Sequence, residues 1–166
     1  MVDFDDWYER EHPRVLAACR ALGGDVDAAA EATSEAFVRA AQRWASVRTM
    51  AAPGGWVQVV ALNQLRRSLH RRRVERRILP RRGEGVEGPP PPDVDLWRAV
   101  ATLPERQQRC VVLRYVHDLP EAEIAALLGI ARGTVASTLS AAREGLRVRL
   151  SQKGHDDDRD GEHIHG

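Results

Sequence analysis

The chain has 166 residues, and its 25 basic and 24 acidic residues leave a formal net charge of +1. This length accommodates one domain or two small ones, and few segments alternate apolar and polar residues with the period of a strand, so we expect an all-α fold. The charges are unevenly distributed: residues 66–82 are strongly basic and residues 156–162 are mostly acidic, so the basic segment favours a polyanionic partner.

Several classes of function are disfavoured by what the sequence lacks. The first residues are charged and no apolar run approaches the length of a bilayer span, so we expect a cytoplasmic protein without membrane insertion. Cys19 and Cys110 are isolated, without the spacing of zinc ligands, so we expect no metal and no other cofactor. A glycine-rich phosphate loop, a zinc-protease motif and a serine nucleophile motif are also missing, and we do not expect an enzyme.

Two amphipathic helices are predicted at the start of the chain. The first covers residues 4–22 and ends at a pair of glycines. Asp25 or Asp27 caps the second, which extends to about Trp44. Its inner face carries small residues that permit close helix packing, namely Ala29, Ala32, Ala36 and Ala40. The plainest interpretation of this second helix is a core helix with a solvated acidic edge.

A third helix, from about Trp56 onwards, turns basic along its outer side. We expect a loop over residues 46–55 before it, because that segment ends in one proline and two glycines. The basic side chains are Arg66, Arg67, His70, Arg71, Arg72, Arg73, Arg76 and Arg77. Charge runs are usually solvated helix faces, but Glu75 is the only acid before Glu84. The pattern therefore favours contact with nucleic-acid phosphates.

Two segments are predicted to lack regular structure. Residues 79–93 are rich in proline and glycine and offer little apolar surface. We therefore expect them to form a flexible linker between one domain at 1–78 and another at 94–150. Residues 151–166 are polar, acidic and histidine-containing, and we expect a disordered tail.

The stretch from residue 119 to 146 has the pattern of a helix-turn-helix. Ile124 and its apolar neighbours share one helical face, Gly129 suits a left-handed turn, and Val135 and Leu139 lie on the inner face of a second helix. Small polar and basic residues lie outside this second helix, which is typical of a recognition helix in the major groove. A helical hairpin that binds no ligand is the alternative. We expect a four-helix, winged-helix-like helix-turn-helix domain.

Both halves of the chain resemble one protein family. The first half contains AAEATSEAF, then Trp44 and GGWVQVVALNQLRRSL, and the second contains LPERQQRCVVLRYVHDLPEAEIAALLGIARGTVASTLSAAREGL. These motifs are similar to those of bacterial RNA polymerase sigma factors of the extracytoplasmic-function (ECF) subfamily. The resemblance covers nearly all of residues 4–150. It implies a region 2-like domain at 1–78 and a region 4-like domain at 94–150.

The resemblance implies three sets of functional residues. Core RNA polymerase would be bound through Glu31, Ser34, Glu35, Phe37 and Val38, where Phe37 is either an exposed anchor or a residue of the hydrophobic core. The −10 promoter element would be bound by Asn63, Gln64, Arg66, Arg67, His70 and Arg71, beside a loop at 46–52 that accepts an unstacked base. The −35 element would be read by Arg132, Ser137 and Thr138, while Thr134, Arg143 and Arg114 hold phosphates.

We therefore expect a sigma factor that binds core RNA polymerase and directs promoter recognition, strand opening and transcription initiation. Its implied partners are core RNA polymerase and promoter DNA, and an anti-sigma factor is a further candidate. Thr138 and Ala141 stand where the family commonly has arginine, which predicts weak duplex binding by the chain alone. The main alternative is a free-standing helix-turn-helix regulator of duplex operator DNA. A protein-binding helical adaptor is also conceivable, but it leaves the basic segment unexplained.

Overall fold

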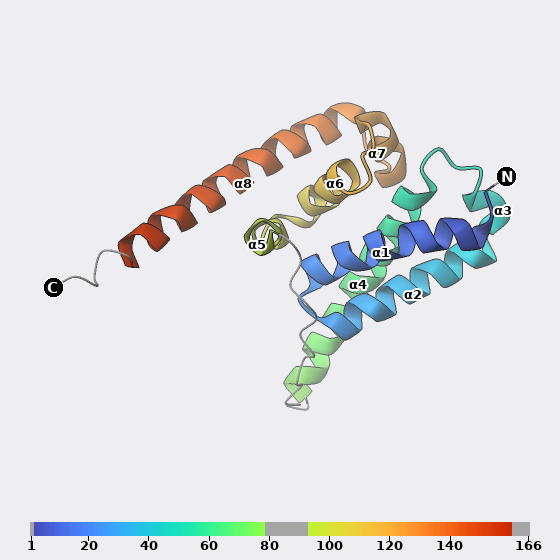
Figure 1. The fold of residues 1–166 in the computed structure, drawn as a ribbon, viewed down its shortest axis with the longest axis horizontal. Coiled ribbons are helices and arrows are strands. Elements are labelled where there is room, and N and C mark those ends of the chain that lie inside the picture. The colour runs from blue at the N-terminus through green and yellow to red at the C-terminus, as the bar shows by residue number, and fades with distance from the viewer. Residues whose placement is uncertain (1, 79–92, 161–166) are drawn as a thin grey trace.

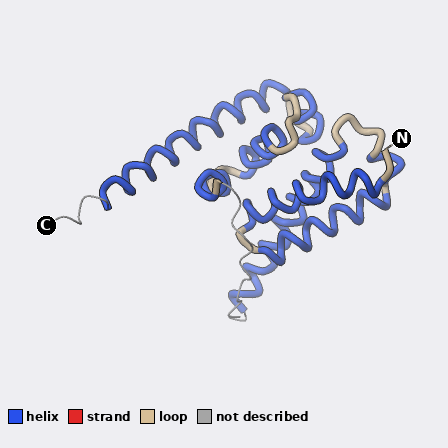
Figure 2. Tube along the Cα trace, viewed as in Figure 1, coloured by secondary structure: helices blue, strands red, loops and turns tan. Residues whose placement is uncertain are grey.

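The computed structural model describes residues 2–78 and 93–160, and every regular element within these ranges is a helix (Figure 2). The first domain comprises α1 (Phe4–Gly23), α2 (Val26–Gln42), α3 (Trp44–Val47) and α4 (Pro53–Ile78), and the second comprises α5 (Val94–Ala101), α6 (Glu105–Tyr115), α7 (Glu121–Leu128) and α8 (Arg132–Asp160). The expected all-α fold of two helical domains is confirmed. The predicted linker lies outside the described residues except for Asp93.

The first domain is built on α1, α2 and α4, which lie side by side (Figure 1). Its tight packing depends on the alanine face of α2, where Ala28, Ala29, Ala32, Ala36 and Ala40 are each at most 1% exposed. Such small side chains let the neighbouring helix backbones approach closely. Asp25 fixes the start of this helix, because its Oδ1 accepts the amide of Ala28 at 2.9 Å.

The second domain contains the predicted helix-turn-helix. Helices α7 and α8 meet at 105°, and Gly129 between them has φ +65°, a left-handed conformation that glycine adopts without steric cost. The prediction that Val135 and Leu139 face inward is confirmed, since they are 0% and 1% exposed and pack with Ile124. The helices α5 and α6 complete the apolar cluster beneath.

Two sequence-based expectations about element boundaries are wrong. The segment 46–55 is not one loop, because α3 occupies its first residues and α4 already begins at Pro53. Proline suits the first helical position, where its missing amide donor costs nothing. The tail is not disordered throughout, because α8 continues to Asp160, while residues 161–166 lie outside the described residues.

The two domains also touch. Leu22 and Val59 of the first domain pack against the apolar cluster of the second, and Ala52, 8% exposed, belongs to that cluster. In Figure 1, α5, α6 and α7 lie beside α1 and α4, while the long α8 and the C-terminal end of α4 both extend away from the body of the molecule. The contact matters for function because α4 carries the basic residues.

Candidate nucleic-acid interface

The basic face of α4 is only partly neutralised by the acids of α2. Asp25 lies within 3.5 Å of Arg72 and 3.8 Å of Arg76, and Glu31 lies 3.1 Å from Arg71 and 3.4 Å from Arg72. These pairs orient the arginines that lie nearest α2. Among the side chains described in residues 2–78 and 93–154, no carboxylate lies within ion-pair distance of Arg67, Arg73 or Arg77, which are all exposed.

The residues predicted to bind the −10 element share one stretch of α4. Helical spacing places Asn63, Arg66, Arg67 and His70 on a common face, and they line a shallow surface hollow of about 520 Å³. Gln64 is half-buried beside them, and Arg71 is turned toward Glu31. The structure therefore brings four of the six predicted side chains together around one concave surface.

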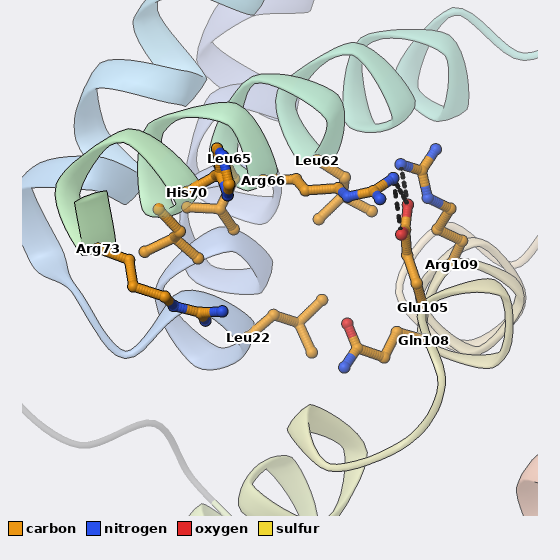
Figure 3. Close-up of a pocket in the computed structure, with 10 residues that line it drawn as sticks. Leu22, Leu62, Leu65, Arg66, His70, Arg73, Glu105, Gln108 and Arg109 are labelled. Atoms are coloured by element: carbon orange, nitrogen blue, oxygen red, sulfur yellow. Dashed lines mark hydrogen bonds and ion pairs between the residues drawn. The ribbon is translucent and has the colours of Figure 1, made fainter.

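Two of these four side chains are engaged by the second domain. Arg66 makes an ion pair with Glu105 at 2.9 Å, and Asn63 accepts a hydrogen bond from Arg109 at 2.6 Å. Figure 3 shows Arg66 and Arg109 both directed at Glu105 on the rim of a neighbouring cavity of about 430 Å³. Arg67 and His70 lack such partners among the described residues, so they remain accessible to a ligand.

Four of the six predicted −35 residues lie in the first two turns of α8, whereas Arg143 lies further along that helix and Arg114 lies on α6. Arg132 is 74% exposed and 3.6 Å from Glu121, Ser137 faces solvent, and Thr134 and Thr138 are half-buried. The other two arginines are held in place: Arg143 donates to the Tyr115 hydroxyl at 2.9 Å, and Arg114 donates to the Leu119 carbonyl at 3.0 Å. The exposed N-terminus of α8 is suited to phosphates and base edges, and the two positioned arginines add fixed positive charge on α6 and further along α8.

Four of the five residues predicted to bind polymerase are exposed on α2. Glu31, Ser34, Glu35 and Val38 face solvent, and Val38 is 51% exposed. Phe37 is the exception: of the two alternatives that the sequence left open for it, the structure shows a residue of the hydrophobic core and not an exposed anchor. It is 3% exposed because its ring packs within 5.3 Å of the rings of Trp7, Tyr8 and His12.

Sequence reasoning missed three buried polar side chains, Glu11, Gln58 and His117. The His117 side chain is 3% exposed, with Nε2 2.9 Å from Gln58 Oε1 and Nδ1 3.8 Å from Glu11 Oε2. Burial lowers the pKa of His117 from its ordinary value of 6.5, opposed by the charge of Glu11; the other charges facing it are Arg14, which lowers the pKa, and Asp118, which raises it. Trp7, Glu11 and Val15 follow one another at intervals of four residues and therefore share the buried face of α1. This spacing is the sequence signal that could have predicted a buried acid at Glu11.

Two searches of the described residues gave negative results. No three His, Cys, Asp or Glu side chains lie close enough together to hold a metal ion in residues 2–78 and 93–154. Within the same ranges no single helix is long and apolar enough to cross a membrane, and only the bent pair of α7 with residues 132–154 of α8 meets the length and composition criteria when the two are taken together.

Fold and site define a class: a two-domain helical protein with a basic helix in one domain and a helix-turn-helix in the other. Family models agree, because "Sigma-70 region 2" matches residues 7–75 and "Sigma-70, region 4" matches residues 93–146. The chain belongs to the sigma-70 family and is of its ECF type.

Individual relatives carry similar descriptions. An ECF RNA polymerase sigma factor, SigE of Mycolicibacterium smegmatis, is 30% identical over an alignment of 166 positions that covers 92% of this chain. The chain spans 63% of the length of that relative. Among solved structures, the sigma factor RpoE in complex with the anti-sigma factor NepR from Bartonella quintana matches the fold with a TM-score of 0.72, at 21% identity, over 90% of this chain and 97% of that one.

Proposed function

We propose that this chain binds core RNA polymerase and directs it to promoters, where it assists strand opening and transcription initiation. One observation carries the proposal: a cationic hollow on α4 and an exposed helix-turn-helix occur on two domains of one chain, within the matched sigma-70 regions. Two separate DNA-reading surfaces on one chain suit a promoter with two elements, because tethering raises the effective concentration of the second contact.

Core RNA polymerase would dock on the outer face of α2. Glu35 and Val38 support this role, because one supplies an exposed charge and the other an exposed apolar surface a turn away. Glu31 has a second task, since its carboxylate bonds Arg71 and Arg72 of α4. A polymerase docked on this face of α2 would therefore also contact Glu31, a residue that helps to hold the arginines of α4 in position.

The opened −10 strand would lie along α4. Arg67 and His70 offer cationic and stacking contacts at the hollow, and Asn63 offers an amide that can read a base edge. Stacking contributes about 1–3 kcal/mol per base, which offsets part of the cost of separating the strands. In the second domain, Arg132 and Ser137 would read −35 base edges, each good contact contributing about 1–3 kcal/mol of discrimination.

Run-off transcription tests the proposal. Core RNA polymerase, the chain and fragmented genomic DNA from the source organism are expected to give discrete transcripts whose start sites share two upstream elements. Glu35→Arg is expected to weaken binding to core RNA polymerase at least tenfold and to leave folding unchanged, whereas the matched Glu9→Arg on the exposed side of α1 retains parental binding. Absence of transcripts, together with tight binding of the chain alone to duplex operators, would favour the free-standing regulator instead.

A further inference from the structure

A cavity with an apolar floor lies between α1, α4 and α6. Its floor consists of Leu22 at the end of α1 and Leu62, Leu65 and Leu69 on successive turns of α4, and we call it the leucine cavity. Leu62 and Leu65 are buried, whereas Leu22 and Leu69 are half-buried and present apolar surface to the opening. The volume of about 430 Å³ falls in the range of small-molecule sites, which are commonly found between domains.

The rim of the leucine cavity carries an excess of positive charge. Arg66 and Arg109 share the carboxylate of Glu105, at 2.9 Å and 2.6 Å. Arg73 lines the same cavity and has no carboxylate within ion-pair distance among the side chains that the structure describes. Three guanidinium groups thus face one carboxylate, and the exposed guanidinium of Arg73 offers the planar donor fork that binds a carboxylate through two hydrogen bonds.

The wall on the second domain is fixed by hydrogen bonds. Gln108 Nε2 donates to the carbonyls of Ala101 at 2.8 Å and of Leu103 at 2.9 Å, and Arg109 donates to Asn63 Oδ1 at 2.6 Å. Figure 3 shows Leu22 and Gln108 in the middle of the cavity, with Arg73 on one side and Arg66 and Arg109 on the other. Because these side chains are already positioned, a ligand pays little of the usual cost of ordering its site.

The lining residues select among ligand chemistries. Within the described part of the chain, no Phe, Tyr or Trp lines the cavity, so it lacks the aromatic surface on which nucleobases stack. Leucine side chains favour an aliphatic body, and the cationic rim favours an acidic head group over an amine. Both requirements are met by an unbranched aliphatic carboxylate.

We propose that the leucine cavity binds a monomeric medium-chain fatty acid, with the carboxylate held by Arg73 and the chain lying over Leu22 and Leu69. This site is separate from the proposed function, but its consequence rests on that function. Arg66 and His70 line both the leucine cavity and the hollow of α4 to which we assign the opened −10 strand. A bound fatty acid therefore competes with single-stranded DNA.

Calorimetric titration of the full chain with sodium decanoate tests the site without DNA or polymerase. Saturable binding at one site per chain is expected. Affinity is expected to rise at least about fourfold for each two methylene groups from hexanoate through octanoate to decanoate, because each added group buries apolar surface on the leucines. Decyltrimethylammonium, which carries the same chain and the opposite charge, is expected not to bind.

A pair of charge reversals on α4 locates the carboxylate. Arg73→Glu is expected to weaken decanoate binding at least about tenfold, because it places a like charge beside the ligand's carboxylate. Arg77→Glu makes the same charge change one turn further along the helix, on an exposed side chain that does not line the cavity, and is expected to keep parental affinity. Both positions are exposed, so both variants are expected to retain the parental circular dichroism spectrum.

Three results would overturn the site: no binding of decanoate, equal binding of decyltrimethylammonium, or equal affinity of the two charge-reversal variants. Binding to phosphatidylglycerol vesicles without binding to monomeric decanoate would also overturn it, in favour of a membrane surface. The consequence for DNA is measured by anisotropy of a short fluorescein-labelled single strand, whose affinity for the parent is expected to fall at least about threefold at saturating decanoate. Absence of run-off transcripts, together with decanoate binding that depends on Arg73, would reject the proposed function and leave the fatty-acid site standing.

Discussion

Replacing Phe37 by alanine distinguishes a residue of the hydrophobic core from a polymerase anchor. Phe37 is 3% exposed, and its ring centroid lies 5.3 Å from that of Trp7 and 5.0 Å from that of Tyr8. Truncating a buried phenylalanine costs about 3–5 kcal/mol, because the lost transfer energy adds to that of the cavity left behind. The exposed neighbour Val38 provides the control, since surface substitutions usually change stability by less than about 0.5 kcal/mol.

Urea unfolding followed by tryptophan fluorescence measures this difference. Trp7 contacts Phe37 directly and Trp44 lies 4.9 Å from Trp7, so their emission reports on the first domain. With a urea dependence of about 1–3 kcal/mol per M, a loss of 3 kcal/mol or more lowers the midpoint by at least about 1 M. Val38→Ala is expected to keep the parental midpoint. If Phe37→Ala also keeps the parental midpoint but loses polymerase binding, the Phe37 ring must instead face the polymerase.

Three further outcomes are expected. Because burial lowers the pKa of His117, its neutral ring contributes its full stability to the folded chain above about pH 6.5, and this contribution is lost as the pH falls below that value, so the midpoint of urea unfolding drops between pH 7.5 and pH 5.5; a rise on acidification would contradict the burial argument. Asp25→Ala removes the cap of α2, costing about 0.5–2 kcal/mol of unfolding free energy in urea titrations, and a parental midpoint would refute that role. Leu139→Asp is expected to unfold the second domain and Ser137→Asp to spare it, as monitored by circular dichroism; equal helicity in both would reject the assigned faces of α8.

Patterns within a few neighbouring residues predicted the helices whose packing depends on such short spacings. The helix-turn-helix follows from apolar spacing together with Gly129, and the packing of α2 follows from its alanines. The period of α2 also places Phe37 beside Ala36 on the buried face, and only the resemblance to a polymerase-binding motif suggested otherwise. Gly54 and Gly55 were read as loop residues, because a sequence cannot show that leucines from another domain require the space at Gly55.

Contacts between the domains were beyond local reasoning. Asn63 and Arg109 are 46 residues apart in sequence, and Gln58 and His117 are 59 apart. The sequence pattern of one helix does not indicate which polar residue of a distant helix its own polar residues will contact. The six predicted −10 residues were therefore correctly placed on one helix, while the engagement of Asn63 and Arg66 by the second domain emerged only from the structure.

Permanganate reactivity of thymines in complexes with core RNA polymerase tests the central claim most directly, because it detects unpaired bases. The parental chain is expected to produce reactive thymines upstream of the start site on promoters found by run-off transcription. Arg67→Ala combined with His70→Ala is expected to remove this reactivity and to leave duplex promoter complexes detectable, because both side chains lie at the hollow of α4 rather than on the helix-turn-helix. Unchanged thymine reactivity in the double variant, or none with the parental chain, would contradict the account.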